Sequence, residues 1–240
     1  MTSRSAPGSG LWWIPSRRVR RKLSLNERTS PFTSLSWLAA ARRRTITSAR
    51  MVAWISTEDT HGQTFAMIAD RLNATLLEHG VEMGTRSAVP QGLAGSKLVI
   101  VGAHGSIAPE GRFFQRVNDE GILKLTAAEL AGALRNVGVV ILFVCSGGRA
   151  DKHPAANTTI GLAKELLDRG CTAVIASPWP LDARVTYHWL PVFLDRWKGG
   201  SLLMDANFQA NLAVSNALGA NPAKCLAMTV FGDPLRTFDS

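Results

Sequence analysis

Cysteine is scarce in this chain of 240 residues. The three cysteines are Cys145, Cys171 and Cys225, an odd number that contains no C-x-x-C pair. The sequence therefore predicts neither a disulfide framework nor a cysteine-based metal site, and we expect no metal and no other cofactor. Sparse free thiols are typical of a reducing compartment, so we expect the protein to be cytoplasmic.

Long apolar runs and nucleotide-binding signatures are also absent. No apolar stretch approaches the length that a bilayer-spanning helix needs, and we predict no contact with a membrane. Basic residues 17–22 follow the short apolar stretch near the start, whereas a secretory signal places its basic residues first. The missing G-x-G-x-x-G and Walker strings weaken one alternative, a flavodoxin-like nucleotide-binding protein.

Acidic residues are nearly missing from the first 50 residues. This part holds eleven of the 27 Lys and Arg residues and one of the 18 acids, so the remainder carries 16 basic and 17 acidic side chains. The net charge of +9 thus belongs to one end of the chain. A nucleic-acid-binding domain would carry its charge on the folded body, so this distribution argues against such a partner. Nucleic acid stays an alternative partner only for the basic residues within 17–50.

Two strings carry the functional prediction: KLVIVGAHGS at residues 97–106 and VVILFVCSGG at residues 139–148. Each begins as an apolar run without polar alternation, which is typical of a central strand in a parallel sheet with both faces covered. The first run ends at His104 and the second at Cys145. Sites in open parallel sheets lie beyond the carboxyl ends of the strands, so neighbouring strands would place both side chains at one edge.

A cysteine and a histidine in these positions predict nucleophilic catalysis. The imidazole of His104 would accept the thiol proton of Cys145 and later protonate the leaving amine. The N–H groups of Gly105 and Cys145 are the candidate donors to an oxyanion. A lone cysteine at a strand end is more often a small buried hydrophobe, and a lone His-Gly is more often a turn. The matched pair favours a Cys/His dyad.

In order and spacing, these strings resemble the His and Cys motifs of the CHAT domain family, which belongs to the caspase-like (clan CD) cysteine peptidases with separase and the gingipains as relatives. LLDRGCTAVIASPWPLDARVT at residues 166–186 and FGDP at residues 231–234 continue the resemblance. Residues 11–16 and 30–44 resemble the family's first strand and first helix. Two departures are Ala103, where the family often has Cys, and Arg-Lys-Leu-Ser at residues 21–24, where it has an apolar-Pro-Leu string.

The resemblance implies an α/β fold, a caspase-like three-layer αβα sandwich with a mainly parallel central sheet. It implies one domain over residues 11–240, with a basic part at 11–50. Residues 1–10 are rich in Ser, Gly and Pro, and this composition predicts a disordered start. The implied function is a cysteine endopeptidase that cleaves a protein or peptide substrate. Relatives are often joined to sensor repeats, and none are present in these residues, so any regulator would act in trans or be missing from this chain.

The resemblance also suggests residues of a substrate pocket. Asp182 is a candidate for accepting a basic substrate side chain, although capping of the following helix explains it equally well. Asp151 is a second acidic candidate. Ser146 leaves room for a substrate strand or belongs to a simple tight turn, and Trp179 lines the cleft or only packs.

Two other functions compete with the peptidase. A catalytically silent CHAT-like interaction or scaffold module stays open, although the retained Cys and His count against it. A class I glutamine amidotransferase sets its nucleophile between glycines and places its His after the Cys. Here Phe143 stands two residues before Cys145, and His104 precedes it, so this alternative is disfavoured.

Periodicity predicts the other elements. One helix should be capped at Thr60 or Thr64 and should end at Gly80. A later helix should begin with a capping box formed by Thr126 and Glu129. Cys171 and Cys225 are interpreted as core residues. Further strands are expected at residues 51–56, 172–177 and 225–232, helices at 34–44, 126–134, 158–170, 183–197 (interrupted near Pro191) and 201–218, and a loop or hairpin at 105–125.

Overall fold

The computed structural model describes residues 35–44, 46, 48–57, 64–107, 115–116, 125–152 and 159–239. The predicted disordered start, the first strand and the capping position Thr60 lie outside the described residues. The single-domain boundary at residue 11 stays a prediction for the same reason.

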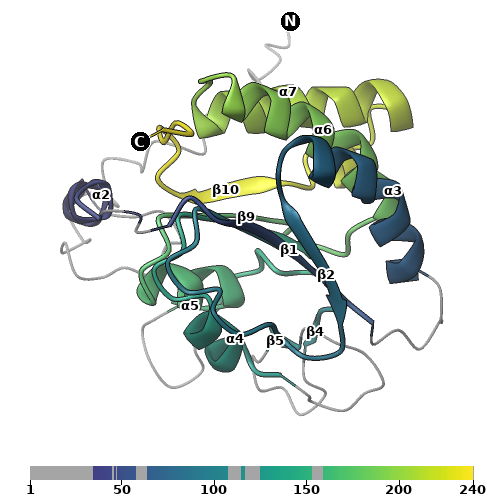
Figure 1. Ribbon diagram of the computed structural model, residues 1–240. Helices are drawn as coiled ribbons and strands as arrows, with labels where there is room; N and C mark the ends of the chain where they lie inside the picture. Colours follow the sequence, from purple (N-terminus) through teal and green to yellow (C-terminus); the bar gives the residue numbers. More distant parts are fainter. Residues whose placement is uncertain are drawn as a thin grey trace, which may run out of the picture.

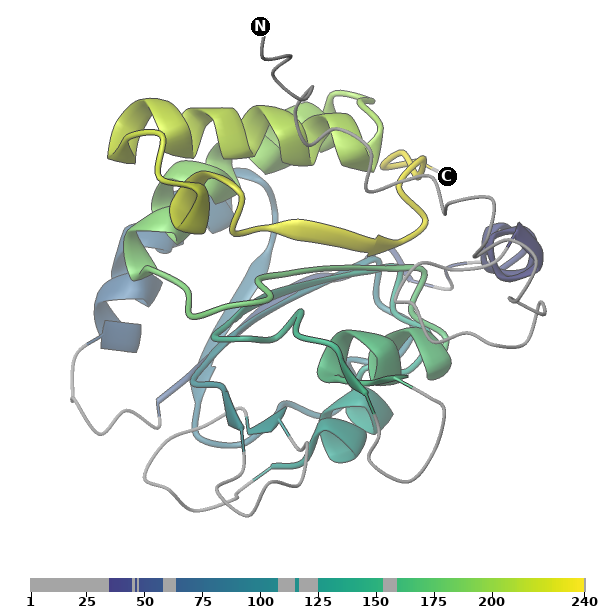
Figure 2. The ribbon, with the colours of Figure 1, turned by 180° about the vertical axis from the view of Figure 1, so that it is seen from behind.

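A six-stranded sheet in the order β10-β9-β6-β3-β1-β2 forms the centre of the molecule (Figures 1 and 2). Neighbouring strands run parallel except for β10, which pairs antiparallel with β9 at one edge. The strands are β1 (Met51–Ser56), β2 (Glu82–Arg86), β3 (Leu98–Ala103), β6 (Val139–Val144), β9 (Ala173–Ala176) and β10 (Thr229–Gly232). This confirms the predicted, mainly parallel sheet.

Helices cover both faces of the sheet and complete three layers (Figures 1 and 2). One face carries α3 and α6, with α7 packed against α6, and the opposite face carries α4 and α5. These helices are α3 (Thr64–Glu78), α4 (Ala127–Ala133), α5 (Leu162–Asp168), α6 (Ala183–Lys198) and α7 (Leu203–Leu218). The capping box at Thr126 and the helix end at Gly80, with its φ of 68°, are both confirmed.

Side chains of β3 and β6 alternate between two separate cores. Leu98 and Ile100 join the core beneath α3 and α6, whereas Val99 and Val101 join the core beneath α4 and α5. Every residue of both strands is buried. A strand covered on both faces needs apolar residues at every position, which explains the two uninterrupted apolar strings in the sequence.

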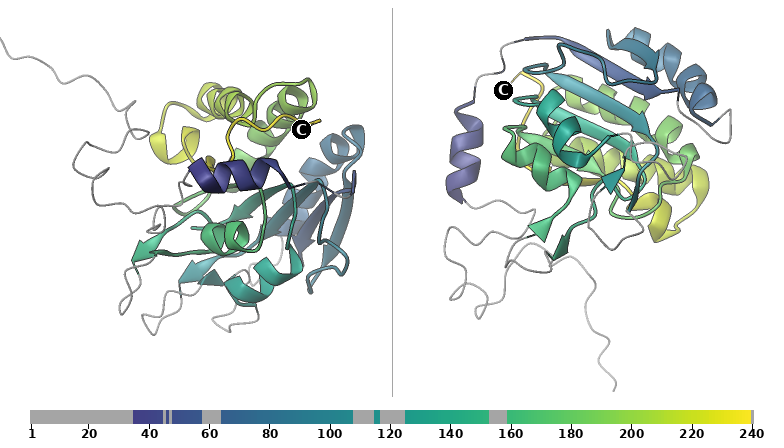
Figure 3. Two further views of the ribbon diagram at one scale, coloured as in Figure 1. Left: turned by 90° about the vertical axis from the view of Figure 1, so that its left-hand side faces the viewer. Right: turned by 90° about the horizontal axis from the view of Figure 1, so that it is seen from below.

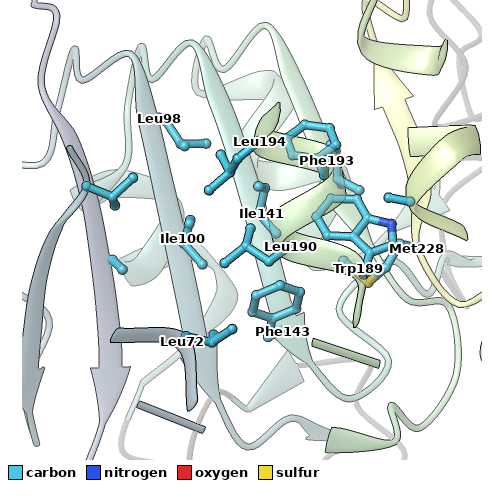
Figure 4. Packing of buried hydrophobic residues seen from close by; sticks show 14 of the residues in the cluster. Leu72, Leu98, Ile100, Ile141, Phe143, Trp189, Leu190, Phe193, Leu194 and Met228 are labelled. Carbon is cyan, nitrogen blue, oxygen red and sulfur yellow. The ribbon is translucent and has the colours of Figure 1, made fainter. Parts of the chain in front are cut away.

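The core beneath α3 and α6 is built around aromatic rings of α6 (Figure 4). Trp189 stacks on Phe193 at 4.5 Å between ring centroids, and Phe193 stacks on Trp197 at 5.8 Å. These rings are buried on one side of a helix that runs through Pro191 without a break. The predicted interruption at Pro191 is therefore wrong, because burial of this aromatic face compensates for the backbone hydrogen bond that proline removes.

Two other expectations need correction, and one strand was missed. The strand expected at residues 225–232 is a short helix, α8 (Pro222–Cys225), followed by β10. Cys225 ends that helix half-buried and is not a core residue. Strand β2 at the sheet edge was not predicted, because its residues are mostly polar and exposed.

Two small hairpins lie in the connections that follow β3 and β6. Strand β4 (Ser106–Ile107) pairs with β5 (Gln115–Arg116), which confirms the hairpin expected after His104. Strand β7 (Asp151–Lys152) pairs with β8 (Thr159–Ile160).

Helix α2 (Leu35–Arg42) lies at the amino-terminal edge of the parallel strands (Figure 3). Arg42 Nε is 3.3 Å from the carboxylate of Asp233, which follows the antiparallel strand β10. The basic residues that the structure describes within residues 11–50 therefore lie at the edge of the sheet opposite the carboxyl ends of β3 and β6. None of the helices in the described ranges is both long and apolar enough to cross a bilayer.

Candidate active site

His104 and Cys145 follow two residues that lie opposite each other in the sheet. Ala103 of β3 pairs with Val144 of β6 in the parallel register, and both side chains face the core beneath α4 and α5. Side chains alternate along a strand, so the next residue on each is directed toward the face covered by α3 and α6. Neighbouring strands are about 4.8 Å apart, so the two backbones leave the sheet side by side.

The His104 ring contacts the helix that covers this face. It packs edge-on against Phe65, in the first turn of α3, with 4.6 Å between ring centroids and an interplanar angle of 78°. His104 is half-buried, and Phe65 is almost fully buried. Aromatic rings prefer such T-shaped contacts, so Phe65 restricts the orientation of the imidazole.

Cys145 contacts the connection that leads into α6, the second helix of the same face. Its Sγ accepts a hydrogen bond from the backbone N–H of Leu181 at 3.4 Å. Leu181 immediately precedes Asp182, the N-cap of α6. The half-buried sulfur therefore lies beside the positive end of a 16-residue helix, an environment that favours an anion.

A tight turn follows Cys145. Ser146 has a φ of 58°, which is unusual for a residue with a side chain. The N–H groups of this turn are bonded within the protein: Ser146 to Trp179 O at 3.0 Å, Gly147 to Val144 O at 3.1 Å and Gly148 to Ser177 O at 2.8 Å. The tight-turn interpretation of Ser146 is confirmed. These three amides are thereby excluded as oxyanion donors, and Gly105 and Cys145 stay the predicted ones.

Trp179 links the β9–α6 connection to α8. Its carbonyl accepts hydrogen bonds from Ser146 N–H and from Ser177 Oγ at 2.8 Å, and its indole Nε1 donates to Ala223 O at 2.8 Å. These contacts fix the position of Trp179, and its role in lining the cleft stays a prediction. Its carbonyl also places it next to the turn that carries Cys145.

Both oxygens of the Asp182 carboxylate are bound by cationic or N–H groups of the chain. The carboxylate accepts from the Arg184 backbone N–H at 3.0 Å, from Arg184 Nε at 3.1 Å and from Arg184 Nη2 at 2.7 Å. Lys224 Nζ of α8 lies 3.3 Å from its second oxygen. The side-chain hydrogen bonds from Arg184 hold the pKa of Asp182 well below its usual range, with Lys224 acting in the same direction. The helix-capping interpretation is confirmed, and the substrate-pocket role stays a prediction.

Asp151 is paired in a similar way. Its carboxylate lies 2.9 Å from Nε of Arg149, which is two residues earlier in the chain. The structure thus accounts for both acidic pocket candidates by contacts within the chain.

The other two cysteines differ sharply from Cys145. Cys171 is fully buried, its thiol donates to Leu134 O at 3.1 Å, and burial raises the pKa of this thiol to about 12. Cys225 is half-buried at the carboxyl end of α8. Within the described ranges, His, Cys, Asp and Glu form no cluster suited to a metal ion.

The sequence interpretation missed the partners that hold the two candidate residues. Phe65 belongs to a helix whose apolar periodicity predicted only a core position. The Leu181 contact is made by a backbone N–H, which carries no sequence signal. Lys224 reaches Asp182 from a segment 42 positions away that was expected to lead into a strand.

Solved structures of known proteins resemble this fold. The Arg-specific cysteine proteinase gingipain R aligns with a TM-score of 0.51 and 14% identity, over 79% of this chain and 47% of that chain. The separase–securin complex of Saccharomyces cerevisiae aligns with a TM-score of 0.49 and 12% identity, over 83% of this chain and 13% of that chain. At such identities the likeness concerns the fold alone, and this chain spans less than half of either.

A search among curated proteins gave no match. The family model of the CHAT domain matches residues 12–223, which is most of the chain. This range contains both candidate strands, the turn after Cys145 and the β9–α6 connection. The chain therefore belongs to the CHAT domain family.

Proposed function

We propose that this protein is a cysteine endopeptidase in which Cys145 is the nucleophile and His104 is the general base. The observation that carries the proposal is the register of β3 and β6, in which the two residues follow the opposed pair Ala103 and Val144. Both side chains make their contacts on the same face, His104 with Phe65 and Cys145 with Leu181.

In the proposed reaction, the thiol proton of Cys145 passes to the imidazole of His104, and Sγ forms a bond to the carbonyl carbon of the scissile peptide. The N–H groups of Gly105 and Cys145 bind the resulting oxyanion. The C–N bond then breaks as His104 returns the proton to the leaving amine. Water hydrolyses the thioester, with His104 accepting its proton, and frees the carboxylate product and the thiol.

Two features support Cys145 over the other cysteines as the nucleophile. Its sulfur lies at the amino end of α6, where the helix dipole and the Leu181 N–H favour negative charge. Cys171 is sealed in the core with its pKa raised to about 12, so it supplies almost no thiolate near neutral pH.

The proposed substrates are proteins or extended peptides. Asp182, Ser146, Trp179 and Asp151 border the turns around Cys145, and we propose that these turns form the wall of the substrate cleft. A regulatory protein that acts in trans and a cytoplasmic location remain predictions from the sequence.

The test is hydrolysis of a quenched peptide library by purified wild-type protein and by Cys145→Ala, His104→Ala and Cys225→Ala variants. Cys225→Ala is the matched control, because it also removes a half-buried thiol. The proposal predicts cleavage by the wild type and the control, and loss of cleavage in the other two at unchanged thermal stability. Cleavage that survives Cys145→Ala would overturn it, and a partner-dependent phenotype unaffected by this substitution would favour the interaction-module alternative.

A further inference from the structure

The wall of the proposed cleft beside Cys145 carries more positive than negative charge. Asp182 lies one residue beyond Leu181, whose N–H contacts Cys145 Sγ. Around its single carboxylate stand two cations, Arg184 from the first turn of α6 and Lys224 from α8. The cluster therefore has a net charge of +1 at neutral pH.

The carboxylate in this cluster is shielded from an incoming cation. Arg184 binds it in the bidentate, fork-like geometry that guanidinium groups favour, with both carboxylate oxygens occupied. Lys224 adds a contact to one of them. A substrate Lys or Arg would have to displace a cation that is already tethered two residues away, and would gain no net ion pair.

The outward side of the cluster is cationic. The Arg184 side chain is 58% exposed, whereas the side chains of Asp182 and Lys224 are each 25% exposed. Each cation retains N–H donors beyond those it gives to Asp182, because a guanidinium has five and an ammonium three. The N-terminus of α6 adds a further positive partial charge at the same place.

From these contacts we propose that Arg184 and Lys224 are specificity-determining residues, and that the cleft rejects Lys and Arg next to the cut and prefers an acidic side chain there. The proposal rests on the proposed function of Cys145. It assigns Asp182 the role of anchoring the two cations at the cleft, in place of binding a substrate cation itself.

Helix α8 and the β9–α6 connection are held together by contacts beyond the charged cluster itself. Besides the Lys224–Asp182 pair, α8 accepts the hydrogen bond from Trp179 Nε1 at Ala223 O, at 2.8 Å. Asn221 caps α8 by accepting from the Ala223 N–H at 3.0 Å. Lys224 is therefore held toward Asp182 by a second, independent contact between the same two segments.

The experiment measures labelling of Cys145 by three peptidyl chloromethyl ketones that differ only in the residue next to the reactive carbon: Arg, Gln or Glu. The thiolate forms a bond to that carbon and chloride leaves, so labelling needs no peptide hydrolysis. Rates are taken from intact mass, and peptide mapping assigns the label to Cys145. We expect the Glu reagent to react about fivefold faster than the Arg reagent, as a partly exposed charge pair supports.

Lys224→Gln and Arg184→Gln should each bring this ratio toward one, with α6 and α8 retained as judged by thermal unfolding. The matched control is Lys164→Gln, which removes a cation paired with Asp168 on α5, on the opposite face of the sheet, and should leave the ratio unchanged. Faster labelling by the Arg reagent, equal rates for all three, or a ratio insensitive to both variants would overturn the proposal. If the three reagents label Cys145 in the predicted order but no peptide is hydrolysed, the result counts against the proposed function alone.

Discussion

The backbone N–H of Leu181 donates a hydrogen bond to the Sγ atom of Cys145 across 3.4 Å. This contact joins two connections that follow different strands, one after β6 and one after β9. The turn after Cys145 is also bonded to the second connection through Ser146 N–H to Trp179 O and Gly148 N–H to Ser177 O. The position of the sulfur therefore depends on how the β9–α6 connection packs, and this dependence can be tested.

Gly148→Ala should destabilise the turn that carries Cys145. An added Cβ would lie 2.9 Å from the Phe231 ring and 3.0 Å from Ala176 O, which are both in the sheet and cannot easily move. We expect a loss of about 1–3 kcal/mol in the free energy of unfolding, as for other overpacked sites. Urea denaturation checks this, together with the rate of peptide cleavage, which should also fall.

The control for this variant is Gly132→Ala in α4, where an added Cβ has nothing within 4 Å. Alanine should leave stability unchanged or raise it by about 0.5–1 kcal/mol, since glycine is unfavourable inside a helix. Equal effects at the two glycines would contradict the steric account of Gly148.

Phe65→Leu should reduce activity through His104. The substitution removes the edge-on ring contact at 4.6 Å but keeps an apolar side chain in the first turn of α3. A loss of about 1 kcal/mol of ring–ring interaction corresponds to a fall of about fivefold in kcat, with KM little changed, because the imidazole would be less well oriented.

Leu76→Ala distinguishes this effect from simple destabilisation. Leu76 is buried in the same helix, near its far end, and its truncation should cost about 2–5 kcal/mol of stability. Assayed well below its melting temperature, this variant should keep the wild-type kcat. A matching loss of kcat in both variants would mean that Phe65 acts only through the stability of α3.

Asp182→Asn should change the pH dependence of stability. The native pKa of Asp182 is held below its usual range, mainly by the hydrogen bonds from Arg184, so the native state binds fewer protons than the unfolded state. The stabilisation by the charged carboxylate is complete above the ordinary Asp value of about 4 and declines as the pH falls below it toward the native pKa. Asn retains the helix cap but not the charge.

Urea denaturation at pH 7, 4 and 3 should therefore show a wild-type advantage over Asp182→Asn that is largest at pH 7 and smallest at pH 3. A constant difference for Asp182→Asn over the same range would show that its carboxylate gains nothing from Arg184 and Lys224.

Cys171 should be inert in the native protein. Its thiol is fully buried, donates to Leu134 O and has its pKa raised to about 12. At pH 8, iodoacetamide should modify Cys145 and Cys225 but reach Cys171 only after unfolding in urea. Modification of Cys171 at the rate of Cys145 in the native state would contradict the core placement.

Much of the fold could be predicted because its central strands have an unambiguous pattern. Val139–Val144 is buried at every position, so its apolar string marks the strand from end to end. Strand β2 has no such pattern, because Glu82–Arg86 forms an exposed edge whose stability comes from pairing with β1. Pro191 misled the prediction because local propensity opposes a helix there, while burial of Trp189 and Phe193 in the tertiary structure favours it.

The candidate site could be predicted to a similar degree. The sequence identifies His104 and Cys145 as residues that end two strands, and the structure adds that these strands are adjacent and in register. The contacts that hold the pair, from the Phe65 ring and the Leu181 N–H, depend on how α3 and α6 pack on the sheet. The pairing of Asp182 with Lys224 depends on the placement of α8, which sequence periodicity did not identify.

The central claim is that His104 activates Cys145. Its most direct test is the rate at which a peptidyl chloromethyl ketone labels Cys145 at neutral pH in folded wild-type protein, in folded His104→Ala, and in wild-type protein unfolded in urea. Our account predicts fast labelling of the folded wild type and labelling slower by about 100-fold or more in the other two, the scale on which an adjacent base contributes. Equal rates in wild type and His104→Ala would contradict it.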